Sequence, residues 1–297
     1  MRALTEATGV TPSTVPSRRP QSLRRRRGKR LPLYLLAAGF GVLTALPFTF
    51  MVLAAFKSRG EFLENPFGLP QEATLANLSG LLTPEFGRYF VNSIVVTLVT
   101  VVATVGFGAM AAYPLARMNF RLSNPVLLLF LVGLMVPIHV TLIPIYTLTQ
   151  SLGIYDTLGA LFGPFIAFSL PLTIYVLVQF FRQIPDSLLE AAEMDGAGPW
   201  RTFWSVLLPL SMPALSTVAI VTFIFVWNEF IFGLILLSSP SNFVLPLGLQ
   251  QFSGQFSVDV PGVMAALTLA SLPTIAFFLV AQERVVKGLA AGALAGQ

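Results

Sequence analysis

Long apolar runs, separated by short segments that carry charge, make up most of this chain. Asp, Glu, Lys and Arg are absent from the stretches 31–56, 89–116, 122–155, 157–181, 202–228 and 260–282, and each stretch holds more than 20 residues. A helix needs about 20 apolar residues to cross the hydrocarbon core of a bilayer, where a charge costs at least about 2.5 kcal/mol. The apolar residues are continuous rather than alternating with polar ones, which favours helices over barrel strands. The pattern therefore predicts six spanning helices, at about 33–56, 90–114, 125–149, 158–181, 210–237 and 261–281.

The composition agrees with this pattern and excludes several classes of protein. Only 10% of the residues are charged, against about 25% in a soluble domain, and the mean hydropathy is +0.78. The chain has no Cys and one His, which excludes a disulfide-stapled domain, a cysteine nucleophile and a Cys-based zinc site. We therefore expect an all-α, polytopic membrane protein with six transmembrane helices and no metal site.

The distribution of Lys and Arg predicts the orientation. Six spans place both termini on one side of the membrane, together with the 115–124 and 182–209 loops, and that side holds 15 of the 18 basic residues. Because basic loops stay in the cytoplasm, we expect both termini there. This divides the chain into a basic, disordered cytoplasmic arm at 1–32, a transmembrane domain at 33–282 and a cytoplasmic tail at 283–297.

The arm contains an Arg-rich cluster, Arg24–Arg30, that needs an interpretation. Such a cluster could bind nucleic acid or anionic lipid. We favour the simpler interpretation, a determinant of topology next to the first span, and we expect no nucleic-acid partner.

The 182–209 loop has the signals of two short helices. Ser187 and Glu190 have the spacing of a capping box, which predicts a helix start, and Gly196 stands where a left-handed C-cap is expected. Pro199 can then open a second helix, from 200 to 208, that Pro209 interrupts before the fifth span. The sequence thus predicts a helix–turn–helix on the cytoplasmic face.

The side chains of this loop favour docking to another protein. Ala191 and Ala192 leave a patch without side-chain bulk, and three acids surround it (Glu190, Glu193, Asp195). The second helix offers Trp200, Phe203 and Trp204 as apolar anchors. The alternative is a helix pair lying on lipid, which the three acids disfavour for the first helix.

The loop also resembles the EAA signature of ABC importer permeases, and it is called the EAA loop below. Glu190-Ala191-Ala192 is followed after three residues by Gly196, and after nine more by Val206-Leu207-Leu208-Pro209. The family pattern has Ile where this chain has Val206, a conservative change. Several further segments are similar to the carbohydrate-uptake branch: Glu190 to Ala197, Phe90 to Ser93, Ala112 to Arg117, Trp227 to Phe230, and, for the maltose-type second permease, Val285 to Gly292.

The resemblance implies a mechanism and a set of partners. Such a permease pairs with a second, similar permease above two cytosolic ATPase subunits, and an extracytoplasmic sugar-binding protein delivers the ligand. ATP and Mg bind the ATPase subunits, whose closure moves the EAA loops and rocks the spans between two orientations. The residues it assigns to ATPase docking are Glu190, Ala191, Ala192, Asp195, Gly196, Ala197 and Pro209, and those it assigns to a tail contact with the ATPase are Lys287, Gly288, Leu289 and Gly292.

We therefore expect a transport subunit rather than an enzyme, with no cofactor of its own. The chain has no Gly-x-x-x-x-Gly-Lys-Ser/Thr run that would bind ATP phosphates. It is expected in the cytoplasmic (inner) membrane of a bacterium or archaeon. The maltose-type tail favours a disaccharide or oligosaccharide as the substrate.

Trp227, Asn228 and Glu229 are the candidates for the sugar path. Aromatic rings stack on sugar faces, while amides and carboxylates bond hydroxyls. In a continuous helix Trp227, Ile231 and Leu234 share a face and Asn228 lies off it. We favour Asn228, because a neutral amide can bond hydroxyls without burying a charge. The alternative is an anchor at the membrane surface, with Glu229 reaching water.

Two other classes of function stay open at this stage. A proton-coupled secondary transporter could use Glu229 and His139, and an intramembrane enzyme is the third possibility. Neither needs a docking helix for an ATPase, so the EAA loop separates them from the leading interpretation.

Overall fold

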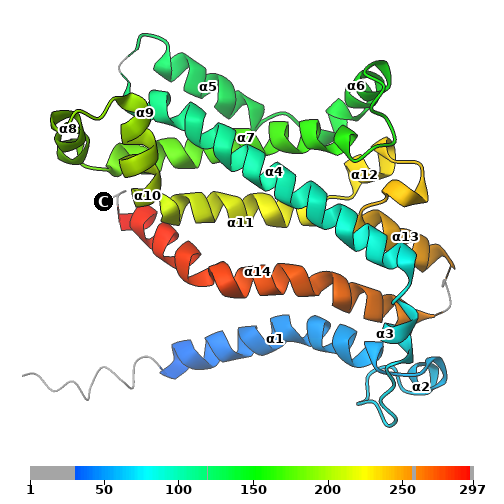
Figure 1. The fold of residues 1–297 in the computed structure, drawn as a ribbon. Helices are drawn as coiled ribbons and strands as arrows, with labels where there is room; N and C mark the ends of the chain where they lie inside the picture. The colour runs from blue at the N-terminus through cyan, green and yellow to red at the C-terminus, as the bar shows by residue number, and fades with distance from the viewer. Residues whose placement is uncertain (1–30, 119, 256–258, 295–297) are drawn as a thin grey trace, which may run out of the picture. The chain divides into compact units, whose positions relative to one another are not determined.

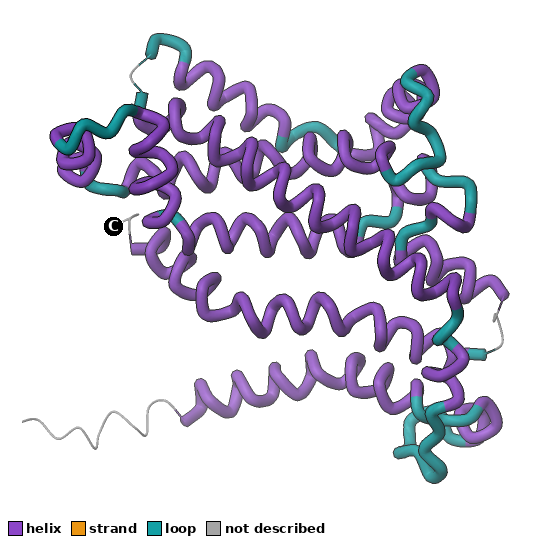
Figure 2. Tube along the Cα trace, viewed as in Figure 1, coloured by secondary structure: helices purple, strands orange, loops and turns teal. Residues whose placement is uncertain are grey.

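The computed structural model describes residues 31–118, 120–255 and 259–294, and the regular structure in these ranges is helical (Figures 1 and 2). At 31, 251–255 and 280–294 only the backbone is described. The chain divides into two units, Met1–Thr49 and Phe50–Gln297. The first holds most of α1 (Leu31–Ala55), and the second holds α2 (Arg59–Glu64), α3 (Ala76–Gly80), α4 (Pro84–Arg117), α5 (Ser123–Gly133), α6 (Ile138–Ser151), α7 (Gly159–Gln183), α8 (Asp186–Met194), α9 (Pro199–Thr202), the π-helix η3 (Phe203–Leu207), α10 (Leu208–Leu210), α11 (Met212–Asn228), α12 (Ile231–Leu236), the 3-10 helix η4 (Pro240–Asn242), α13 (Leu245–Gln255) and α14 (Val260–Leu294).

Within the described residues, four helices are long and apolar enough to cross a membrane: α1, α4, α7 and α14. Two further pairs pass the same test together but are bent, α5 with α6 by 94° and Pro199–Leu210 with α11 by 75°. Counting each bent pair as one span gives six. The predicted all-α, polytopic architecture is confirmed, and two of the six predicted spans are bent rather than straight.

The bend between α5 and α6 follows from Pro137. The residue before a proline disfavours the helical conformation, so a helix cannot easily continue through Val136 into Pro137. Helix α5 ends at Gly133, and Pro137 stands at the N-cap of α6 with an extended backbone. The predicted span at 125–149 is therefore broken at 134–137 instead of forming one continuous helix.

The bend before α11 falls at Ser211, two residues beyond the predicted interruption at Pro209. Proline at 213 has no N–H to donate to the carbonyl four residues earlier, and its ring crowds that carbonyl. The ladder of helical hydrogen bonds therefore stops between Pro209 and Pro213. Ser211 is fully buried, and its hydroxyl donates to the Leu207 carbonyl at 2.7 Å.

The fifth span also ends elsewhere than predicted, whereas the sixth, Val260–Leu279, agrees with the predicted 261–281. Helix α11 stops at Asn228, Glu229 is extended, and a separate helix, α12, begins at Ile231, so the predicted helix at 210–237 is wrong. Trp227, Ile231 and Leu234 therefore do not share one helical face. Helix α14 continues to Leu294, well past the predicted end of its span at 281.

Helix α4 packs against α7, and α11 lies between α7 and α14 (Figure 1). Two clusters of buried apolar side chains hold these helices together. One surrounds Phe165, Trp227 and Phe232, and the other, towards the EAA loop, includes Phe181, Phe203 and Leu207. Because Phe203 and Leu207 of η3 belong to the second cluster, the EAA loop packs directly against the core.

Candidate functional site

The first helix of the EAA loop, α8, begins at Asp186. Its N-cap is Pro185, which makes no side-chain cap, and Ser187 lies one residue inside the helix. The predicted capping box of Ser187 and Glu190 is therefore wrong. The acid at the first helical position, Asp186, faces the positive end of the helix dipole and takes over part of the stabilisation that a cap supplies.

The end of α8 is a Schellman motif. The Gly196 N–H donates to the Glu193 carbonyl at 2.9 Å, and the Ala197 N–H donates to the Ala192 carbonyl at 2.9 Å. Gly196 has φ +78°, the left-handed conformation that glycine adopts without a steric cost. The predicted C-cap at Gly196 is confirmed, and it sets the angle at which α8 turns back toward α9.

The exposed surface of α8 differs from the predicted one. Ala191 is exposed, but Ala192 is buried and faces the protein, so the two alanines do not form one open patch. The exposed apolar side chains are instead Leu188 and Met194, which is 88% exposed. Three exposed acids flank them: Glu190, Glu193 and Asp195. The surface offered to a partner thus carries both acidic and apolar side chains.

The second half of the loop is one helical segment with a π turn in its middle. Helix α9 opens with Pro199 at its first turn, η3 follows, and α10 carries the exposed Pro209. Phe203 is buried in the core, whereas Trp200 and Trp204 are 63% and 59% exposed. Two of the three predicted aromatic anchors are therefore available to a partner, and the third holds the loop in place.

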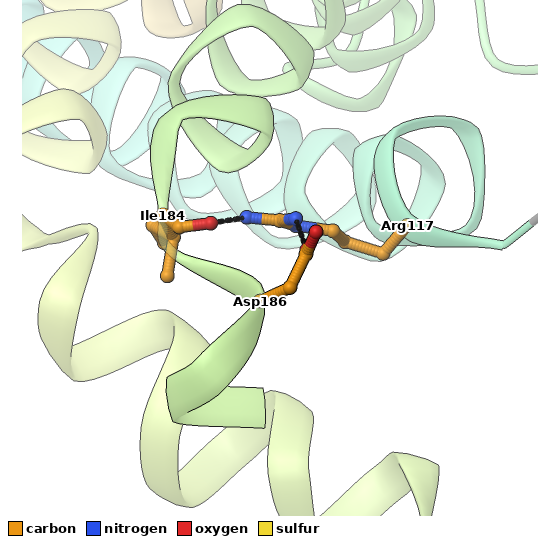
Figure 3. Close-up of polar contacts among 3 residues, drawn as sticks. All are labelled: Arg117, Ile184 and Asp186. Carbon is orange, nitrogen blue, oxygen red and sulfur yellow. Dashed lines mark hydrogen bonds and ion pairs between the residues drawn. The ribbon is translucent and has the colours of Figure 1, made fainter. Parts of the chain in front are cut away.

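Helix α4 holds the EAA loop at two points. Arg117, the last residue of α4, pairs with Asp186 (Nη1 to Oδ1, 2.6 Å) and donates through Nη2 to the Ile184 carbonyl (Figure 3). One turn earlier on α4, the Tyr113 hydroxyl donates to the Pro199 carbonyl at 3.3 Å. One contact thus fixes the start of α8 and the other the start of α9. The sequence analysis cited Arg117 only as part of a motif and missed this role.

The candidates for the sugar path occupy three different environments. Trp227 is buried, stacks on Phe223 and donates through Nε1 to the Ala270 carbonyl at 3.1 Å, so it packs between α11 and α14. Asn228 is exposed, and its amide donates back to the Ile224 carbonyl at 2.7 Å. The Glu229 carboxylate accepts from the backbone N–H groups of Ile231 and Phe232, which caps α12.

The opposite end of α4 binds the chain near α13. The Asn92 amide donates to the carbonyls of Ser241 and Phe243, at 3.0 and 2.9 Å, and the Ser93 hydroxyl accepts from the Leu245 N–H at 2.7 Å. Leu245 is the first residue of α13, so Ser93 satisfies an amide that has no partner inside that helix. The motif Phe90 to Ser93 thereby fixes the start of α13.

Asp156, between α6 and α7, joins two connecting segments. Its carboxylate accepts from the backbone N–H groups of Ser238 and Ser239, at 2.8 and 2.9 Å, and from the Ser239 hydroxyl. The Asn242 amide donates to its carbonyl and, at 3.4 Å, to its carboxylate. Burial raises the pKa of Asp156, but these hydrogen bonds outweigh it and lower the pKa from 3.8 to about 2. Its φ of 56° is a left-handed conformation that Asp tolerates better than most residues.

The remaining predicted site residues lie near the C-terminus. Lys287, Gly288, Leu289 and Gly292 belong to the last turns of α14, where the backbone is helical and the side chains lie outside the described residues. The predicted arm, 1–32, falls outside the described residues except for its last two positions.

Comparison with known proteins bears on the same segments. Residues 104–290, which include the EAA loop, match the family described as "Binding-protein-dependent transport system inner membrane component". The protein ORF2 of Caldicellulosiruptor sp. strain Rt8B.4, whose name places it among ABC transporter permeases, is 41% identical over 89% of this chain and 96% of its own length. The trehalose/maltose transport system permease protein MalG of Thermococcus litoralis is 33% identical over 91% of this chain and 98% of its own.

The fold is similar to that of a solved transporter. A chain from the crystal structure of a bacterial ABC transporter involved in alginate import superposes with a TM-score of 0.75, at 23% identity, over 89% of this chain and 99% of that one. The match over 104–290 and the two relatives establish the family from the sequence. The chain belongs to the family of binding-protein-dependent transport system inner membrane components, and it is an ABC permease, a transport subunit rather than an enzyme.

Proposed function

We propose that this chain is one permease subunit of an ATP-driven sugar importer, and that the EAA loop docks α8 into a separate ATPase subunit. The observation that carries the proposal is the construction of α8. It is exposed on one side and closed by the Schellman motif at Gly196, and Arg117 ties its start to α4. A helix held in this way moves as a rigid body with α4, as a part that transmits force between subunits has to do.

The surface of α8 and α9 has the chemistry of a docking site. Interface cores are enriched in Met and aromatic residues, and charged groups gather at the rim. Met194 and Trp200 are the most exposed large apolar side chains of the loop. Asp195 directly follows Met194 in the chain, and Glu190 precedes it by four residues, about one helical turn. We propose that Glu190, Ala191, Asp195, Gly196 and Ala197 face the ATPase, while Ala192 supports α8 from behind.

The orientation and the partners are part of the proposal. The EAA loop and both termini lie in the cytoplasm of a bacterial or archaeal cell, since 15 of the 18 basic residues fall on that side. A second permease completes the pathway, two ATPase subunits bind ATP and Mg below it, and an extracytoplasmic binding protein delivers the sugar above it. The α14 backbone that carries Lys287 to Gly292 is proposed to reach the ATPase.

The substrate is proposed to be a neutral disaccharide or oligosaccharide. The name of the Thermococcus relative connects it with trehalose and maltose. Membership in a binding-protein-dependent family supports this function over proton-coupled transport through Glu229 and His139. The Glu229 carboxylate, moreover, is already occupied by the amides of α12. Asn228 is the one of the three predicted path residues with an exposed side chain and is kept as a contact at the outer end of α11.

Co-purification and ATPase measurements test the proposal. The tagged chain, expressed with its neighbouring transport genes, should bring down a second permease and an ATPase, and the binding protein with sugar should stimulate ATP hydrolysis. A reporter fused after Gln297 should be cytoplasmic. Recovery of the chain alone in stable form, or ATP hydrolysis indifferent to the binding protein, would contradict the proposed function.

A further inference from the structure

A groove between α5, α7 and α11 has no role in the site described above. It encloses about 290 Å³, close to the lower limit of small-molecule pockets. Ser169 and Thr173 on α7 line it, as do Thr217 and Thr222 on α11. Ser169 follows the start of α7 by ten residues, or about 15 Å at 1.5 Å per residue, in a helix of 25 residues. The groove therefore lies in the middle third of the membrane-spanning region.

Three of the four hydroxyl-bearing residues of this groove are buried (Ser169, Thr173 and Thr222), and the Ser169 hydroxyl is unpaired within the described part of the chain. Ser169 is 7% exposed, and its Oγ has no hydrogen-bond partner among the described residues. A serine in a helix commonly donates to the carbonyl four residues earlier, and Ser169 does not. Thr217 donates to the Pro213 carbonyl at 2.9 Å, which leaves its oxygen able to accept. A buried hydroxyl without a partner costs about 1–3 kcal/mol, so a ligand that pairs with it recovers that free energy.

The remaining walls of the groove suit a sugar ring. Phe168 and Phe225 also line it and offer apolar ring surfaces, and no charged side chain does. The break between Gly133 and Pro137 runs along one side, where the helical hydrogen-bond ladder is interrupted. Irregular backbone at membrane depth is tolerated where protein buries it or where it lines a water-filled cavity, and broken helices form the substrate sites of many transporters.

A second cavity shows what an apolar pocket in this protein looks like. It encloses about 370 Å³ between α4, α11 and α14 and is lined by Ile94, Leu98, Phe223, Trp227 and three further apolar residues. Among the described residues that line it, Trp227 is the one with a polar side-chain group, and its indole N–H already donates to the Ala270 carbonyl. That lining suits lipid or a packed side chain, whereas four hydroxyls in the first groove suit a ligand that is itself rich in hydroxyls.

We propose that the groove between α5, α7 and α11 is the part of the sugar path that this subunit supplies. Ser169, Thr173 and Thr222 exchange hydrogen bonds with the hydroxyls of a neutral sugar ring in transit, and Phe168 and Phe225 cover its apolar face. The inference rests on the proposed function and deepens it. It places the main sugar contact at mid-membrane on α7 and α11, rather than at Asn228 near the end of α11.

Hydroxyl-deleting variants with matched controls test this assignment. The complete transporter is reconstituted in proteoliposomes and supplied with neutral disaccharides that include maltose and trehalose. Ser169→Ala, Thr173→Val and Thr222→Val each remove a hydroxyl, and valine keeps the methyl of Thr173 that packs against Gly108. One lost hydrogen bond of about 1–3 kcal/mol corresponds to about a five- to hundredfold rise in the sugar concentration for half-maximal uptake.

The controls come from α4. Thr100 and Thr104 are fully buried and also carry hydroxyls without a partner among the described residues, yet neither lines the groove. Thr100→Val and Thr104→Val should leave uptake within about twofold of wild type. Equal effects of the groove variants and the α4 variants would overturn the inference.

Thiol labelling supplies an independent measurement, because the natural chain contains no Cys. A Ser169→Cys variant carries the only thiol of this subunit, and a small methanethiosulfonate reagent should label it during turnover. The transported sugar should slow that labelling, while a Thr104→Cys variant should stay unlabelled. Failure of the sugar to protect would overturn the inference and leave the proposed function standing. A wild-type transporter that takes up none of the sugars would instead overturn the proposed function.

Discussion

The attachment of the EAA loop through Arg117 can be tested by its asymmetry. The Arg117 side chain is 10% exposed, whereas the Asp186 side chain is 78% exposed. Removing Arg117 should therefore cost more stability than removing Asp186. An exposed ion pair is worth at most about 1 kcal/mol. The second contact of Arg117, to the Ile184 carbonyl, is a partly buried hydrogen bond from a charged group, worth about 1.5–3 kcal/mol. Most of the anchoring energy should therefore lie in the backbone contact.

Three variants separate the two contacts. We expect Arg117→Ala to loosen the start of α8 by about 2 kcal/mol, and Asp186→Ala to loosen it by less than about 1 kcal/mol. Arg117→Lys keeps the charge but has no planar fork to reach both partners, so it should fall between them. Hydrogen exchange of the α8 amides in the assembled transporter measures the loosening, and stimulation of ATPase activity by the binding protein measures its consequence. The reasoning is refuted if Asp186→Ala is as damaging as Arg117→Ala, or if Arg117→Ala leaves both measurements unchanged.

Three further predictions concern other positions. Gly196→Asp should keep membrane insertion but abolish transport and ATPase stimulation, because it adds a side chain at φ +78° and brings bulk and negative charge to the proposed docking surface; unchanged coupling would contradict it. Lys57→Met should expose the 58–75 segment to limited proteolysis at unchanged expression, because the buried Lys57 ammonium donates to the Asn65 carbonyl at 2.6 Å. Asp156→Asn keeps the left-handed backbone but loses the charge. Since the folded pKa is lowered from 3.8 to about 2, the carboxylate stabilises the folded state above about pH 4 and that contribution is lost toward pH 2. The difference in melting temperature between wild type and the Asp156→Asn variant should therefore shrink as the pH falls across that range.

The sequence predicts best where one physical rule decides the outcome. The charge-free runs locate the four long helices α1, α4, α7 and α14, and Gly196 marks its turn because few residues adopt a positive φ. The capping box failed because Ser187 and Glu190 have a spacing that also occurs inside a helix, and the N-cap is Pro185, two residues before Ser187. Ala192 was assigned to the wrong face because that choice depends on where α8 packs.

The tertiary contacts of the site carry almost no sequence signal. Arg117 and Ile184 are 67 residues apart, and Asn92 and Phe243 are 151 apart, so no local pattern connects them. The break at Glu229 was missed because an acid inside an apolar run is interpreted first as a functional group. Its use here, as an acceptor for two amides of α12, becomes visible only once the helix is seen to stop. The mid-membrane groove was missed because its serine and threonines are common in membrane helices.

These contacts divide the protein into a stiff part and a deformable part. Helix α4 is unbroken over 34 residues and packs on α7, and the absence of a side chain at Gly108 lets Thr173 of α7 approach closely. From Asn92 to Arg117, α4 spans about 37 Å at 1.5 Å per residue, and it holds the start of α13 at one end and of α8 at the other. A displacement of the EAA loop therefore reaches α13 without bending α4.

The deformable part lies beside this stiff pair. The breaks at 134–137, at Ser211 and at Glu229 interrupt hydrogen-bond ladders, so φ and ψ can change there at a lower cost than inside a helix. All three breaks border α5 or α11, which form the groove together with α7. When α4 and α7 move as one body, α5 and α11 can tilt about their breaks, and the spacing across the groove changes. The proposed sugar contact at mid-membrane and the proposed ATPase contact at the EAA loop are then connected by the stiffness of α4 and the hinges of its neighbours.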